Sequence, residues 1–95
     1  MSELIIIAHI HAKADQVDFV KSALNQLVAP TRAEAGCLRY DLHQDNADST
    51  HFMFYEAWQT RELWQQHMQS EHLKNFSAQA GGAIERSSIY EMTTL

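Results

Sequence analysis

The stretch from His51 to Phe76 limits what this chain can fold into more than any other part of the sequence. It begins with an alternation of side chains that is typical of a β-strand, and it continues with apolar residues at helical spacing. Thr60 and Ser70 are residue types that cap helices, so the pattern predicts two short helices after the strand. These helices carry His67 and His72. An aromatic strand followed by helices with histidines is typical of a pocket wall.

The N-terminal part of the chain predicts a strand and then a helix. The run from Leu4 to His11 is apolar at the start of both faces, which is typical of a central strand covered on both sides. A single hydrophobic stripe over residues 17–31 predicts a helix capped by Asp15. Pro30 should kink this helix or end its regular part, and Gly36 should follow as the stop.

Two more strands complete the order of elements. Residues 37–43 alternate as a half-buried strand, and the polar cluster at 44–50 joins it to the aromatic strand as a hairpin. Residues 86–92 supply a last strand after a hinge at Gly81-Gly82. The order βαββαβ predicts an α+β, ferredoxin-like fold with one antiparallel sheet and helices on one face. We expect one domain over residues 1–95.

The size and charge of the chain limit the classes of partner that it can bind. With 95 residues and 45% hydrophobic content, the chain is near the lower limit for a self-sufficient core, so we expect a homodimer that covers the second face of the sheet. The net charge is −5 and the basic residues are scattered, which argues against nucleic acid as a partner. Cys37, the single cysteine, suits a reducing compartment. The apolar run at residues 4–8 is too short for a signal sequence or membrane span, so we expect a cytoplasmic protein with no membrane contact.

His67 and His72 are the main candidates for proton transfer. On one continuous helix they would point about 140° apart, which excludes a zinc site of the HExxH type. If Ser70 begins a new helix, both could face one cavity, and His72 would lie in a first helical turn that disfavours its charged form. In the alternative, His67 replaces an apolar residue on the packed stripe and bonds a backbone carbonyl.

Glu56 is unusual because it shares a strand face with Phe54 and Trp58. A carboxylate among aromatic side chains is either paired with a cation or has a raised pKa that suits proton transfer. We expect the pair, with Arg39 or Arg32 as the partner.

No motif in the sequence predicts a metal or a cofactor. His9 and His11 point to one face of a strand and could bind a metal jointly, but no third ligand has a place beside them. Cys37 has no base to activate it and is expected to be a buried thiol. Glycine-rich nucleotide loops and the haem-attachment pattern are absent from the sequence. We therefore expect neither metal nor cofactor.

Three segments together resemble the antibiotic biosynthesis monooxygenase family, and within it the small quinol monooxygenases of bacteria. They are TRAEAGCLRYDLHQD (residues 31–45), FYEAW (54–58) and HMQSEHLKNF (67–76). The resemblance implies a dimeric α+β barrel made of two ferredoxin-like units. It also implies an oxidoreductase that oxidises a quinol or related small aromatic with O2, using neither metal nor flavin.

The resemblance suggests a role for several side chains. The chemistry it implies needs a dry aromatic slot, a base and a donor for the oxyanion. His67 or His72 would be the catalytic base. The expected substrate-binding residues are Trp58, Phe54, Phe76, Tyr40, Arg39 and Glu56, with Tyr40 and Arg39 as possible oxyanion donors.

Other functions in the same superfamily are not all excluded. Haem degradation is disfavoured, because Ala8 and Ser77 stand where that branch has an asparagine and a histidine. An isomerase or degrader of a small signalling carbonyl compound, such as the phosphorylated autoinducer-2 product, would have similar motifs. Phosphate binding would need basic residues at the pocket, for which Arg39, Lys74 and Arg86 are the candidates. A non-catalytic barrel that binds a small molecule is the third possibility.

Overall fold

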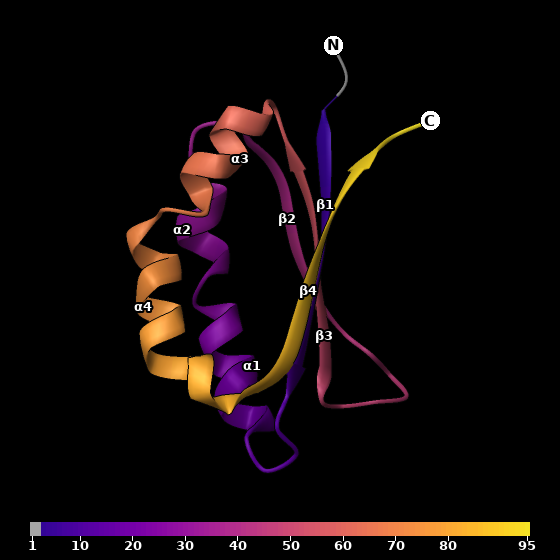
Figure 1. The fold of residues 1–95 in the computed structure, drawn as a ribbon, viewed down its shortest axis with the longest axis vertical. Coiled ribbons are helices and arrows are strands. Elements are labelled where there is room, and N and C mark those ends of the chain that lie inside the picture. The colour runs from indigo at the N-terminus through magenta and orange to yellow at the C-terminus, as the bar shows by residue number, and fades with distance from the viewer. Residues whose placement is uncertain (1–2) are drawn as a thin grey trace.

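A computed structural model describes residues 3–95, and its elements follow the expected order. They are β1 (Leu4–Ala12), α1 (Val17–Asn25), α2 (Val28–Arg32), β2 (Cys37–Gln44), β3 (His51–Trp58), α3 (Arg61–His67), α4 (Glu71–Ala80), a 3-10 turn (Gly81–Ala83) and β4 (Ile84–Thr93). The strands form one sheet in the order β2-β3-β1-β4, and every neighbouring pair is antiparallel. The helices lie together on one face of this sheet (Figure 1). This is the predicted ferredoxin-like α+β fold.

The position of β1 in the sheet is as predicted, and one of its two faces is covered within the single chain. β1 lies between β3 and β4, so it is central. Ile6, Ala8 and Ile10 point to the helices and are buried in the core. The alternate residues, such as Ile7 and His9, point to the other face, which no element of residues 3–95 covers. One apolar face of the sheet is therefore left open in the single chain.

The predicted first helix is divided in two. α1 ends at Asn25 and α2 begins at Val28, so the break comes before Pro30, which lies inside α2. Proline has no N–H to bond the carbonyl of residue 26, so the ladder of helical hydrogen bonds cannot continue through this point. Asp15 does not cap α1. The N-cap position is Gln16, and no side chain bonds the free N–H groups there.

The helical region ends at Arg32 with Ala33 as its C-cap, before the predicted stop, and Gly36 makes the turn that leads the chain into β2. Its φ of 84° is the left-handed conformation that glycine adopts without cost. The space beside it is filled, because a Cβ placed there would lie 2.8 Å from Cβ of Leu63 in α3. The loop that carries Glu34 is therefore packed directly against α3.

The two helices after β3 begin where the sequence predicts. Thr60 is the N-cap of α3, and its Oγ1 accepts a hydrogen bond from the Leu63 N–H at 3.2 Å. Ser70 is the N-cap of α4, but its Oγ is buried and bonds no described residue. The chain turns between the two helices, which changes the direction in which His72 points relative to His67. No helix within residues 3–95 has the length and hydrophobicity needed to cross a membrane.

Candidate active site

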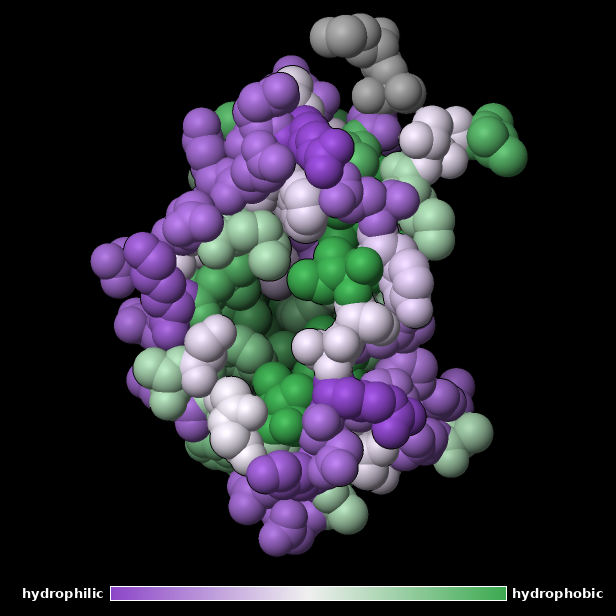
Figure 2. All heavy atoms as spheres, viewed as in Figure 1, coloured by the Kyte–Doolittle hydropathy of each residue, from purple (hydrophilic) through white to green (hydrophobic). Residues whose placement is uncertain are grey.

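A cavity of about 580 Å³ lies between the sheet and the helices. Figure 2 shows it as a hollow lined by hydrophobic side chains, between the helices and β4. Its walls include the aromatic side chains Tyr40, Phe54 and Phe76, together with aliphatic residues of α1, β1 and β4. The ionisable residues in the lining, besides Tyr40, are Glu56, His67, Lys74 and His9, and the side chain of His9 points to the open face of the sheet. This cavity is a mostly apolar slot with few polar groups, as small-molecule sites usually are.

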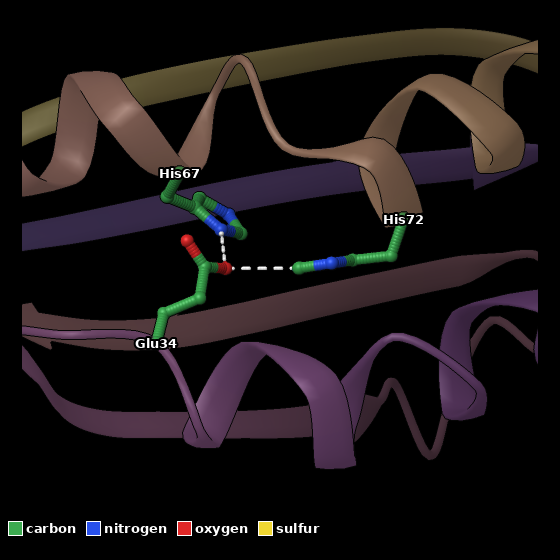
Figure 3. Close-up of side chains that lie close together, drawn as sticks. All are labelled: Glu34, His67 and His72. Carbon is green, nitrogen blue, oxygen red and sulfur yellow. Dashed lines mark hydrogen bonds and ion pairs between the residues drawn. The ribbon is translucent and has the colours of Figure 1, made fainter.

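Glu34, His67 and His72 form a hydrogen-bonded cluster (Figure 3), and His67 is the member of this cluster that lines the cavity. Oε2 of Glu34 lies 2.6 Å from Nδ1 of His67 and 2.9 Å from Nε2 of His72. His67 is the last residue of α3, and His72 is in the first turn of α4. Glu34 comes from the loop between α2 and β2. The turn between the two helices is what brings both imidazoles to one carboxylate.

The Glu34 carboxylate determines which nitrogen of His67 carries the proton. A carboxylate can only accept hydrogen bonds, so Nδ1 of His67 must donate, and in the neutral ring Nε2 keeps its lone pair. Nε2 is on the side of the ring away from Glu34 (Figure 3). Burial lowers the pKa of His67, although Glu34 opposes this effect. His67 is therefore a neutral imidazole at pH 7, and it forms part of the cavity wall.

Aromatic side chains hold the His67 ring in place. The ring of Trp58 is 4.7 Å from it, centre to centre, and that of Tyr40 is 5.6 Å away with its edge toward the imidazole. Trp58 is fully buried and does not line the cavity. The prediction that Trp58 forms part of the slot is therefore wrong. It lies behind His67 because the strand turns its large ring into the core under α3.

The expectation that both histidines face one cavity is also wrong. His72 lines a separate and smaller cavity of about 190 Å³, in which Phe76 is another wall residue. Phe76 lines both cavities and so lies between them. Of the two histidines, only His67 is placed to contact a molecule in the larger cavity.

Glu56 points into the cavity without a cation beside it. Its side chain is 4% exposed, and the indole N–H of Trp58 donates a hydrogen bond to Oε1 at 2.9 Å. Burial raises the pKa of Glu56 to about 7; the indole bond lowers it, and the charge of Glu34 adds to the rise. Among the described residues, Glu56 makes no ion pair with Arg39 or Arg32, so the expected pair is wrong. The structure supports the alternative, a buried carboxyl with a raised pKa.

Arg39 does not reach the site because side chains alternate along a strand. Tyr40 points to the helices and lines the cavity, so Arg39 must point to the open face of the sheet. There it bonds Asp41 and lies over the ring of Tyr55. Arg32 also bonds Asp41, at 3.2 Å. The expectation that Arg39 binds substrate or an oxyanion is wrong for this reason.

The group that sequence reasoning missed is Glu34. It lies in the segment of residues 31–45 that carried part of the family resemblance, two residues before the glycine of the turn into β2. Its partners are 33 and 38 residues away along the chain, so no local pattern could reveal their contact. The same three side chains could also hold a metal ion, since their ligand atoms all lie within 4.8 Å of one another.

Known proteins match this architecture over most of its length. The sequence model of the antibiotic biosynthesis monooxygenase family matches residues 4–79. The chain belongs to this family. The Mycobacterium tuberculosis protein named “Putative monooxygenase Rv0793” is 32% identical over 85 residues, which are 90% of this chain and 83% of that protein.

Solved structures of the family have the same fold. PA3566 from Pseudomonas aeruginosa is 37% identical with a TM-score of 0.96, and the match covers 100% of this chain and 96% of that one. A structure described as an antibiotic biosynthesis monooxygenase is 30% identical with a TM-score of 0.91, covering 97% of this chain and 98% of that one. By homology, then, the chain is grouped with monooxygenases.

Proposed function

We propose that this protein is a cofactor-independent monooxygenase that oxidises a quinol or related phenolic aromatic with O2. The observation that carries the proposal is the Glu34–His67 pair, which leaves a neutral imidazole nitrogen available beside an aromatic-lined cavity. A buried base next to an apolar slot is what proton removal from a phenol needs. His67 is the proposed base, and Glu34 the residue that positions it.

The cavity lining favours an aromatic over a phosphorylated substrate. Of the three basic residues considered for phosphate binding, only Lys74 lines the cavity. Arg39 and Arg86 are on strand positions that face the open side of the sheet. Phe54, Phe76 and the largely apolar wall suit a flat ring instead.

The proposed reaction begins when Nε2 of His67 takes the phenolic proton. The resulting anion is electron-rich enough to reduce O2 directly, and the peroxide that forms on the ring collapses to a quinone. Tyr40 lines the cavity, and its burial raises its pKa well above the usual range, so its hydroxyl stays protonated. It is suited to donate a hydrogen bond to the substrate oxyanion.

We also propose that two chains pair through the open face of the sheet. This face carries apolar side chains that are half-buried or exposed in the single chain: Ile7, Met53, Tyr55, Tyr90 and Met92. A second copy would cover them, as the family resemblance implies. Sedimentation at micromolar concentration should give a dimer, and a monomer would contradict this part of the proposal.

Oxygen uptake with a panel of reduced quinols and phenols tests the proposal. Wild-type protein should consume O2 saturably and well above the rate of unaided autoxidation. The double variant His67→Ala, His72→Ala should fall to that background. Background uptake by the wild type across the panel would reject the oxygenase and direct attention to small carbonyl compounds, on which a histidine base could act without O2.

A further inference from the structure

Glu56 is a buried carboxyl in the cavity wall that the proposed reaction does not yet use. It is on β3, on the face toward the helices, and it lines the same cavity as His67. Both groups contact Trp58, since its indole N–H bonds Glu56 and its ring lies against His67. Oε1 of Glu56 has that one donor. Oε2 bonds no residue among 3–95, and the Glu56 side chain is part of the cavity lining.

The surroundings of Glu56 favour its neutral, protonated form. The ionisable groups around it are Tyr40 from β2, Cys37 at the start of β2, Glu34 from the preceding loop, and His67 and Lys74, which line the same cavity from α3 and α4. Among these groups, Glu34 is the one whose charge shifts the pKa of Glu56. Glu34 is negative, the thiol and phenol are neutral or negative, and His67 is neutral at pH 7. A carboxylate buried without a cation is costly, so the group keeps its proton until another base removes it.

We propose that Glu56 is the acid that protonates the oxygen released when the peroxide bond of the intermediate breaks, while His67 removes the hydrogen on the same carbon. This inference rests on the proposed function and deepens it. One imidazole cannot take a proton from carbon and give one to the departing oxygen in the same step. Two groups are needed, and the cavity wall supplies His67 as the base and Glu56 as a protonated carboxyl.

The step balances with O2 as the only oxidant. The phenolic proton passes through His67 to the peroxide, giving a ring carbon that carries both H and O–OH. His67 then takes the proton from that carbon, the C–H electron pair becomes the C=O bond, and the O–O bond breaks. The departing hydroxide takes the proton of Glu56 and leaves as water. Overall, the phenolic O–H, one ring C–H and O2 become the two C=O groups of a quinone and water, and proton return from His67 to Glu56 resets the site.

This balance defines the substrate class more closely. The carbon that reacts must carry a hydrogen and must be conjugated with the hydroxyl group, as in a phenol or naphthol with a free ortho or para position. A substrate whose ortho and para carbons are all substituted has no proton to lose from the peroxide carbon. With such a substrate, O2 should still be consumed, but the reaction should stop at the hydroperoxide and form no quinone.

The variant Glu56→Gln tests the role of the acid. Glutamine has the same shape and its carbonyl can accept the Trp58 indole bond, but it cannot donate an acidic proton. With a naphthol as substrate, wild type should form one quinone for each O2 and release no peroxide. Glu56→Gln should consume O2 at a rate within about threefold of wild type. Its quinone formation should fall on the order of a hundredfold, the usual size of a lost proton-transfer group, and peroxide should appear instead.

The pH profile and a matched variant separate this role from a structural one. Quinone formation by wild type should decline as pH rises above about 7, where Glu56 loses its proton. Quinone formation by Glu56→Gln should lack this decline. Glu91→Gln, at a half-exposed glutamate of β4 bound to Arg61, should behave as wild type. Wild-type yield and pH profile in Glu56→Gln would overturn the inference and leave the proposed function standing.

A readout without turnover keeps the two proposals distinguishable. In protein labelled with ¹³C at the glutamate carboxyl carbons, NMR should find one carboxyl that titrates near pH 7 and is missing from Glu56→Gln. If every glutamate titrates near its ordinary pH, Glu56 is not the acid, whatever the activity. If wild type consumes no O2 with any phenol, both proposals fail.

Discussion

The carboxylate of Glu34 lies 2.6 Å from Nδ1 of His67, a contact between residues 33 positions apart in the chain. It depends on two local features: the turn at Gly36 that packs the Glu34 loop on α3, and the end of α3 at His67. Because the contact fixes the tautomer of a buried imidazole, a change at Glu34 should alter the behaviour of His67 without touching the cavity itself.

Replacing Glu34 with glutamine should slow turnover roughly tenfold to a hundredfold, less than loss of the base itself. The amide can still accept from Nδ1, but it has no charge to stabilise the imidazolium that forms. Because Glu34 raises the pKa of His67 against the effect of burial, its removal should move the acidic limb of the pH–rate profile to lower pH. The profile of kcat against pH checks this. Glu62→Gln, at an exposed site in the first turn of α3, is the control and should leave the profile unchanged.

The free energy of unfolding should fall as pH rises from about 4.5 to about 7 because of Glu56. In the unfolded chain this carboxyl ionises near its ordinary pKa of 4.5, whereas in the fold it ionises near 7. Between these values the folded state binds more protons, so rising pH disfavours it. At about 1.4 kcal/mol for each pKa unit, the contribution lost is about 3 kcal/mol.

The comparison with Glu56→Gln isolates this effect from other titrating groups. The lowered pKa of His67 acts in the opposite direction but is common to both proteins. Urea unfolding at pH 4, 6 and 8 should therefore give a stability difference that moves in favour of the variant as pH rises. Parallel pH dependence in the two proteins would show that Glu56 is not buried without a counter-charge.

Gly36→Ala should destabilise the fold by about 1–3 kcal/mol. Its φ of 84° disfavours any other residue, and the new methyl group would lie against Leu63. Gly82→Ala is the matched control, since its added methyl group would meet nothing within 4 Å. It should change stability by less than about 1 kcal/mol. Thermal unfolding of both variants measures the difference, and equal values would argue against the tight packing of this loop on α3.

Gly81 and Gly82 are predicted to act as a hinge between α4 and β4. They lie in a 3-10 turn, and Gly81 lines the cavity. Alanine at both positions meets no neighbouring atom, so stability should be nearly unchanged. If opening of this turn admits substrate, turnover should slow more than stability changes. Turnover and stability that change by the same proportion would remove the case for a mobile segment.

Local patterns were sufficient to predict the fold because each element has its own signal. Alternation marked β3, the N-cap Thr60 marked α3, and Gly36 marked the turn before β2. The errors arose where two signals competed. Pro30 was expected to kink the helix or end its regular part, but the break comes before the proline, between Asn25 and Val28, and α2 includes Pro30.

The site was only partly predictable, because its contacts join distant segments. His67 could be proposed from its helix, and Glu56 from its odd place among aromatic residues. The partner of Glu56 could not be predicted, because its hydrogen-bond donor is the indole of Trp58 on the same strand and not an arginine. The position of Arg39 was predictable, because neighbouring side chains on a strand alternate, so Arg39 and Tyr40 point to opposite faces of the sheet. Glu34 needed the tertiary fold to reveal its role.

Oxygen uptake by protein stripped of metal with a chelator tests the central claim most directly. The comparison is between wild type, His67→Asn and His72→Asn with one phenol that wild type oxidises. His67→Asn should lose on the order of a hundredfold or more in rate, since the base is gone. His72→Asn should stay within about tenfold, because His72 lines the smaller cavity and acts only through Glu34. Full activity in His67→Asn would contradict the account, as would stripped wild type that is inactive until a divalent metal is restored.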